Sequence, residues 1–121
     1  MRVLIVDDEE DIRRIGRLAL ARVGGMEVVE ASDGAEGLRR AAEDHPDVVL
    51  LDLMMPGMDG AATLQKLRAD PATAAIPVVF LTAKAQPAEI AKLKEMGAVG
   101  VLTKPFDPMT LSERLKALLP A

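Results

Sequence analysis

Short runs of apolar residues alternate along the chain with longer segments in which apolar residues recur at helical spacing. Residues 3–6, 48–51 and 78–81 are apolar at every position, which is typical of strands buried on both faces of a parallel sheet. Residues 27–31 and 99–102 are interrupted by glutamate or glycine, and we expect them to form the exposed edges of that sheet. The pattern therefore predicts five strands.

Five helices are predicted between and after these strands, each bounded by residues that favour helix ends, such as aspartate or proline at the start and glycine at the end. They run from about residue 10 to 23, from 34 to 43, from 60 to the residue before 70, from 87 to 97, and onward from 107. On the first helix, one face carries Ile12, Ile15, Ala19 and Val23. We expect this face to pack against the sheet.

The regular alternation of strand and helix predicts the fold class. A strand followed by a helix, five times over, is typical of an α/β protein with helices on both faces of a parallel sheet. Right-handed crossovers then favour a doubly wound, flavodoxin-like (βα)5 arrangement with strand order 2-1-3-4-5. We expect residues 1–121 to form one domain, with its site at the carboxyl ends of the strands.

Composition and charge exclude several classes of function. The chain has no cysteine, which excludes disulfides and thiolate metal sites. It shows neither a signal peptide nor an apolar run long enough to cross a bilayer, so we expect a cytoplasmic protein without membrane contact. A net charge of −4 repels phosphate backbones and argues against direct binding of nucleic acid by this chain.

Chemically distinctive residues stand where the apolar runs stop. Asp7 and Asp8 follow the first predicted strand, Asp52 the third, Thr82 the fourth, and Lys104 lies just beyond the fifth. Parallel strands bring all five into one crevice. Three converging carboxylates repel one another unless a cation intervenes, and Mg²⁺ suits oxygen ligands and keeps waters that a phosphate can displace. Taken alone, each aspartate could instead be a turn former or helix cap, and Lys104 a surface charge.

Four motifs resemble the receiver domain of two-component response regulators, over essentially the whole chain. They are residues 6–9 (VDDE), 50–60 (LLDLMMPGMDG), 81–83 (LTA) and 103–106 (TKPF). The resemblance implies that Asp52 is the phosphoacceptor and that Mg²⁺ is held by Asp8, Asp52 and the carbonyl of Met54, with Asp7 acting through a water. It further implies that Lys104 and Thr82 contact the phosphoryl oxygens, and that the bond before Pro105 is cis.

The resemblance also implies a function and its partners. A sensor histidine kinase or a histidine phosphotransfer protein would donate the phosphoryl group to Asp52. The modified domain would then bind a downstream protein, or act on an effector domain absent from this sequence, through the face formed by the fourth helix, fifth strand and fifth helix. Such a domain is a signalling module rather than an enzyme that turns over a metabolite.

One position departs from the family pattern. Many receivers carry a switching tyrosine or phenylalanine three residues before the lysine, where this chain has Val101. Valine is short and stiff about its first side-chain torsion, so we expect switching to proceed through Thr82 and backbone shifts. The alternative function is a protein-interaction module with a receiver fold that does not depend on phosphorylation.

Overall fold

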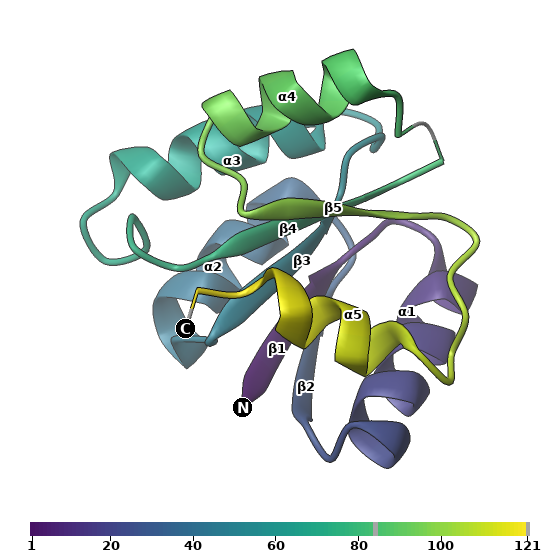
Figure 1. The fold of residues 1–121 in the computed structure, drawn as a ribbon. Coiled ribbons are helices and arrows are strands. Elements are labelled where there is room, and N and C mark those ends of the chain that lie inside the picture. Colours follow the sequence, from purple (N-terminus) through teal and green to yellow (C-terminus); the bar gives the residue numbers. More distant parts are fainter. Residues whose placement is uncertain (84, 121) are drawn as a thin grey trace.

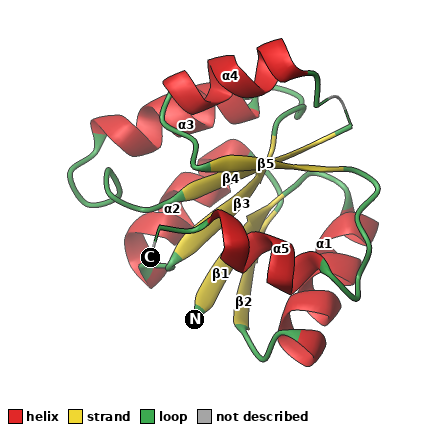
Figure 2. Cartoon of the chain, viewed as in Figure 1, coloured by secondary structure: helices red, strands yellow, loops and turns green. Residues whose placement is uncertain are grey.

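The computed structural model describes residues 1–83 and 85–120, so Lys84 and Ala121 of the predicted domain lie outside the described residues. Five parallel strands form one sheet in the order β2-β1-β3-β4-β5 (Figures 1 and 2). The strands are β1 (Arg2–Val6), β2 (Glu27–Ala31), β3 (Val48–Asp52), β4 (Val78–Thr82) and β5 (Gly100–Thr103). This architecture confirms the predicted fold class and strand order.

Helices cover both faces of the sheet (Figure 1). One face carries α1 (Glu10–Leu18), its continuation η1 (Ala19–Val23) and α5 (Leu111–Leu118), and the other carries α2 (Gly34–Asp44), α3 (Gly60–Ala69) and α4 (Pro87–Glu95). Each interface contains its own apolar core, because alternate residues of every central strand point to opposite faces. In the described part of the chain, no helix is both long enough and apolar enough to cross a bilayer.

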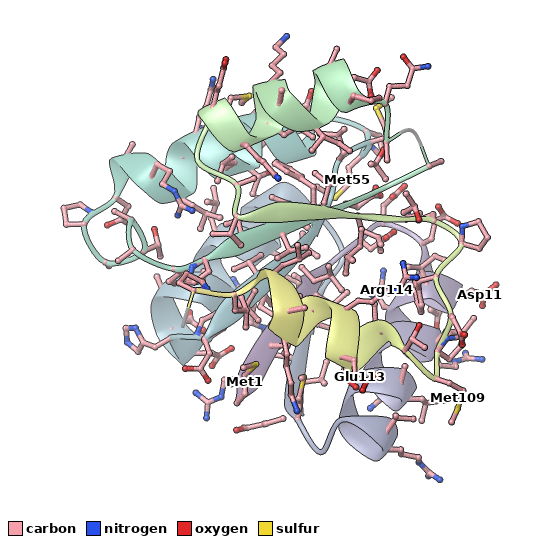
Figure 3. All side chains as sticks on the ribbon, in the orientation of Figure 1. Met1, Asp11, Met55, Met109, Glu113 and Arg114 are labelled. Carbon is pink, nitrogen blue, oxygen red and sulfur yellow. The ribbon has the colours of Figure 1, made fainter. Side chains whose placement is uncertain are left out.

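Met55 closes the core that lies between the sheet and helices α2, α3 and α4, near the carboxyl ends of the strands. It is buried with residues of α3, α4 and the sheet, and Figure 3 shows it between the strands and the helices above them. Its neighbour Met54 is exposed. A flexible thioether fills irregular space of this kind well.

The predicted inner face of the first helix is wrong at two positions. Ile15 and Val23 are 43% and 45% exposed, whereas Gly16, Ala19 and Leu20 are buried. A side chain at Gly16 would begin 3.2 Å from Ile5, so the glycine lets α1 lie close to the sheet. The wider π-helical turn of η1 then shifts the phase of the remaining residues. An apolar count could not detect a core position occupied by glycine.

The start of the last helix is also wrong in the prediction. Residues 108–110 form a turn, and α5 begins at Leu111. The side chain of Asp107 accepts a hydrogen bond from the Met109 amide at 2.9 Å, so it caps this turn rather than the helix. Leu111 and Leu115 of α5 are buried against the sheet.

Candidate functional site

Asp52 is the last residue of β3 and is only 3% exposed. Its Oδ1 accepts a hydrogen bond from the Met54 amide at 3.2 Å. Its Oδ2 is buried and receives no hydrogen bond from the described residues. A buried carboxylate oxygen without a donor is costly, so this atom is poised to gain from a cation or a covalent bond.

The turn after Asp52 requires glycine at position 60. A Cβ there would lie 2.4 Å from the Asp52 carbonyl oxygen and 2.8 Å from Leu53 Cα. Asp59 caps α3 by accepting a hydrogen bond from the Ala62 amide at 2.8 Å. The first turn of α3 thereby packs directly against the backbone of Asp52 and fixes the position of this residue.

Asp7 and Asp8 follow β1 and complete an acidic cluster with Asp52. One carboxylate oxygen of each of the three residues lies within 4.8 Å of the others. Asp7 is fully buried, and Asp8 is exposed at the mouth of the cluster. The Asp7 amide donates to the Ala31 carbonyl oxygen at 3.1 Å, and Asp7 Oδ1 accepts from the Glu9 amide at 2.9 Å. Neighbouring backbone therefore holds Asp7 firmly.

Lys104 brings a positive charge into this cluster from the other side. Its Nζ lies 2.9 Å from Asp7 Oδ2 and 3.3 Å from Asp52 Oδ1. Burial lowers the pKa of Lys104, but the Asp7 and Asp52 carboxylates outweigh burial and raise that pKa above its ordinary value. The peptide bond between Lys104 and Pro105 is cis, which confirms the prediction made for it.

The protonation of Asp52 reflects opposing influences. Burial and the negative charge of Asp7 raise the pKa of Asp52 to about 6, against the lowering effects of Lys104 and the Met54 amide. One ammonium group thus does not balance the carboxylates around it. A divalent cation would favour the ionised form that a nucleophile needs.

The residues present fit Mg²⁺. Asp52 Oδ2 is buried without a hydrogen-bond donor among the described residues. The buried Asp7 Oδ2 has Lys104 Nζ at 2.9 Å as its cationic partner. The donor set is carboxylate oxygen, with the exposed Asp8 reachable from solvent, and hard oxygen ligands of this kind suit Mg²⁺. The assignment of the Met54 carbonyl as a further ligand stays a prediction.

Thr82 and Val101 lie on the neighbouring strands. Thr82 is buried at the end of β4, and its carbonyl oxygen accepts a hydrogen bond from the Lys104 amide at 2.8 Å. Val101 is half-buried in β5 opposite Phe80 and packs on the core beneath α4. A groove of about 420 Å³ runs between α4 and the loop after β3 and reaches Thr82.

Two contacts near the site were missed from the sequence. Glu9 Oε1 lies 3.6 Å from Lys104 Nζ, and Arg13 of α1 donates from Nη1 to the Asp7 carbonyl oxygen at 2.8 Å. The position of Glu9 next to two aspartates was a signal for the first. No sequence signal separates Arg13 from the other arginines of its helix.

Comparison with known proteins places this geometry in a family. Residues 3–116 match the response regulator receiver domain. The chain is 43% identical over 118 residues to the response regulator PleD of Caulobacter vibrioides and 42% identical to the probable transcriptional regulator ycf27 of Guillardia theta. It covers 26% and 45% of the lengths of these two relatives, which extend well beyond the matched region.

Solved structures agree with the sequence relatives. The chemotaxis protein CheY4 of Vibrio cholerae superposes with a TM-score of 0.90 at 36% identity, and 98% of each chain is covered. A response regulator from Desulfuromonas acetoxidans gives a TM-score of 0.85 at 29% identity, covering 97% of this chain and 94% of that one. The chain belongs to the response regulator receiver domains of two-component signalling.

Proposed function

We propose that the chain is a single receiver domain, residues 1–121, in which Asp52 accepts a phosphoryl group from a phosphohistidine donor. The convergence of Asp7, Asp8 and Lys104 on a buried Asp52 is the observation that carries this proposal. Phosphoryl transfer needs an in-line nucleophile and positive charge around the equatorial oxygens. Asp52 supplies the nucleophile and Lys104 part of the charge.

The reaction balances without further reagents. A carboxylate oxygen of Asp52 forms a bond to phosphorus while the bond from phosphorus to the donor imidazole nitrogen breaks, and the imidazole keeps the electron pair and takes up a proton. Lys104, already 3.3 Å from Asp52 Oδ1, faces the incoming oxygens. Thr82 lies at the end of the adjacent strand, and its hydroxyl would hydrogen-bond to these oxygens after transfer. Hydrolysis of the acyl phosphate by water later restores Asp52 and releases phosphate.

Asp8, Asp52 and the Met54 carbonyl would hold Mg²⁺ directly, with Asp7 acting through a water. The bound ion would supply positive charge to the transferring group. Asp7 also orients Lys104 through the 2.9 Å contact between their side chains. A protonated Asp52 could not attack phosphorus, and burial together with Asp7 favours that form. The positive charges of Lys104 and of the bound ion would serve to keep the Asp52 carboxylate ionised.

The proposed output is a change in protein binding at the face formed by α4, β5 and α5. Thr82 borders the groove beside α4, so a movement of Thr82 toward the phosphoryl group would change the shape of this groove. The donor would be a sensor histidine kinase or a histidine phosphotransfer protein. The relatives carry the names of transcriptional regulators and a chemotaxis protein, and the downstream target here is a protein or an attached effector domain.

Intact-mass spectrometry after incubation with acetyl phosphate tests the proposal. The parent should gain the mass of one phosphoryl group when Mg²⁺ is present and none when EDTA is present. Asp52→Asn should gain none in either case. An adduct of equal yield on Asp52→Asn, or no adduct on the parent, would overturn the assignment of the acceptor.

A further inference from the structure

Arg13 lies on α1, outside the acidic cluster, but its side chain reaches back to the loop that carries two of the carboxylates. Its Nη1 donates to the Asp7 carbonyl oxygen at 2.8 Å, and its side chain is only 17% exposed. We propose that Arg13 is a positioning residue that orients the peptide between Asp7 and Asp8 for Mg²⁺ binding. This inference rests on the proposed function of the acidic site.

The geometry of the peptide bond makes this contact specific for Asp8. The Asp7 carbonyl and the Asp8 amide belong to one rigid plane. A donor that fixes the Asp7 oxygen therefore also fixes the direction in which the chain enters Asp8. Asp8 is the exposed member of the cluster, so its placement relies on the backbone that leads into it.

The other hydrogen bonds of the loop do not restrain this carbonyl. The Asp7 amide is bound to Ala31, and Asp7 Oδ1 is bound to the Glu9 amide. Glu9, which precedes α1, makes no side-chain cap hydrogen bond. Among the described residues, Arg13 is thus the one whose side chain ties α1 to the Asp7 carbonyl, and its loss would leave a carbonyl of a fully buried residue without this donor.

Arg13 is itself held by an acidic residue of the edge strand. Its Nε lies 3.5 Å from Glu30 Oε1, and the other oxygen of Glu30 lies 3.2 Å from Arg17 Nε. Glu30 is half-buried on β2 beside Ile5 of β1. This contact balances the charge of Arg13 locally, which makes its effect on the metal site one of geometry rather than of net charge. A planar guanidinium can serve both partners at once, which an ammonium does less well.

A comparison of Arg13→Met with Arg14→Met tests the inference. Arg14 is the next residue of the same helix, is 61% exposed and forms an ion pair with Glu10 at 3.8 Å, so both variants lose one positive charge from α1. Mg²⁺ dissociation constants should be measured from amide chemical shifts at fixed ionic strength. Arg13→Met should weaken Mg²⁺ binding about tenfold, as is common for residues that orient metal ligands, and Arg14→Met less than twofold.

Acetyl phosphate kinetics provide a second measurement. The Mg²⁺ concentration that half-saturates adduct formation should rise about tenfold in Arg13→Met, while the rate at saturating Mg²⁺ changes less than threefold, as expected for a residue that positions metal ligands. If Arg13 had a purely structural role, Arg13→Met would lower the unfolding midpoint in EDTA but would not raise the half-saturating Mg²⁺ concentration.

Three outcomes decide the matter. Equal Mg²⁺ affinities in Arg13→Met and Arg14→Met would overturn the role of Arg13 while leaving the proposed function intact. Absence of Mg²⁺ binding and of any adduct in the parent would overturn both. If Arg13→Met does not fold, Arg13→Lys decides instead: the inference expects its Mg²⁺ affinity to fall about threefold, and parent-like affinity would refute it.

Discussion

Replacing Asp52 by asparagine should stabilise the metal-free domain. Burial and Asp7 raise the pKa of Asp52 from 3.8 to about 6, and each tenfold change in proton affinity corresponds to about 1.4 kcal/mol. At neutral pH the ionised Asp52 therefore lowers the free energy of unfolding by at most about 3 kcal/mol. Asparagine removes that charge but also weakens the hold on Lys104, so we expect a gain of about 1–2 kcal/mol.

The pH dependence of this gain has a definite sign. A carboxyl group with a raised pKa binds more protons in the folded than in the unfolded chain between about pH 4 and pH 6, so stability falls as pH rises through that window. Below about pH 4 the group is protonated in both states. The difference in unfolding free energy between Asp52→Asn and the parent should therefore be small at pH 4 and reach its full value by pH 7.

Urea unfolding followed by circular dichroism in EDTA measures this difference, since the chain has no tryptophan or tyrosine to report by fluorescence. Asp11→Asn, an exposed substitution of equal charge, serves as the control and should stay within about 0.5 kcal/mol of the parent. Mg²⁺ at 100 times its dissociation constant should add about 2.7 kcal/mol to the parent and less to the variant. An Asp52→Asn protein no more stable than the parent at pH 7 would refute this reasoning.

Three further predictions concern the neighbours of Asp52. Lys104→Met should slow adduct formation from acetyl phosphate about 100-fold at saturating Mg²⁺, and a rate within threefold of the parent would contradict its role. Gly60→Ala should cost about 2–4 kcal/mol in urea unfolding, because its Cβ would meet the Asp52 carbonyl oxygen; no loss of stability would contradict the close approach. Thr82→Ala should abolish most of the amide shift changes that beryllofluoride causes in α4, β5 and α5, and unchanged shifts would exclude a relay through Thr82.

The arrangement of the site could be predicted from the sequence because each chemical group follows a strand. A buried parallel strand appears as an uninterrupted apolar run, so its end is visible as the first polar residue. Asp7 and Asp52 are found in this way, and the topology then brings them to one edge of the sheet. The roles carried over from the family also depend on this placement.

Contacts that depend on helix phase could not be predicted in the same way. On α1 the core position at Gly16 carries no side chain, so an apolar pattern assigned Ile15 to the wrong face. Arg13 lies among charged residues that are typical of a solvated helix surface. Its contact with the Asp7 carbonyl depends on how closely α1 approaches the sheet. Start sites of helices are similarly uncertain, because Asp107 can cap a turn as readily as a helix.

With valine at position 101, we expect a phosphoryl signal to leave the site without an aromatic relay. The Lys104 amide donates to the Thr82 carbonyl oxygen at 2.8 Å, so the two residues expected to grip the phosphoryl group are already joined through their backbones. We expect a movement of one toward the phosphoryl group to displace the other. The groove of about 420 Å³ beside Thr82 leaves α4 room to respond. We therefore expect a switch that needs no aromatic side chain, because the strand ends themselves would carry the displacement.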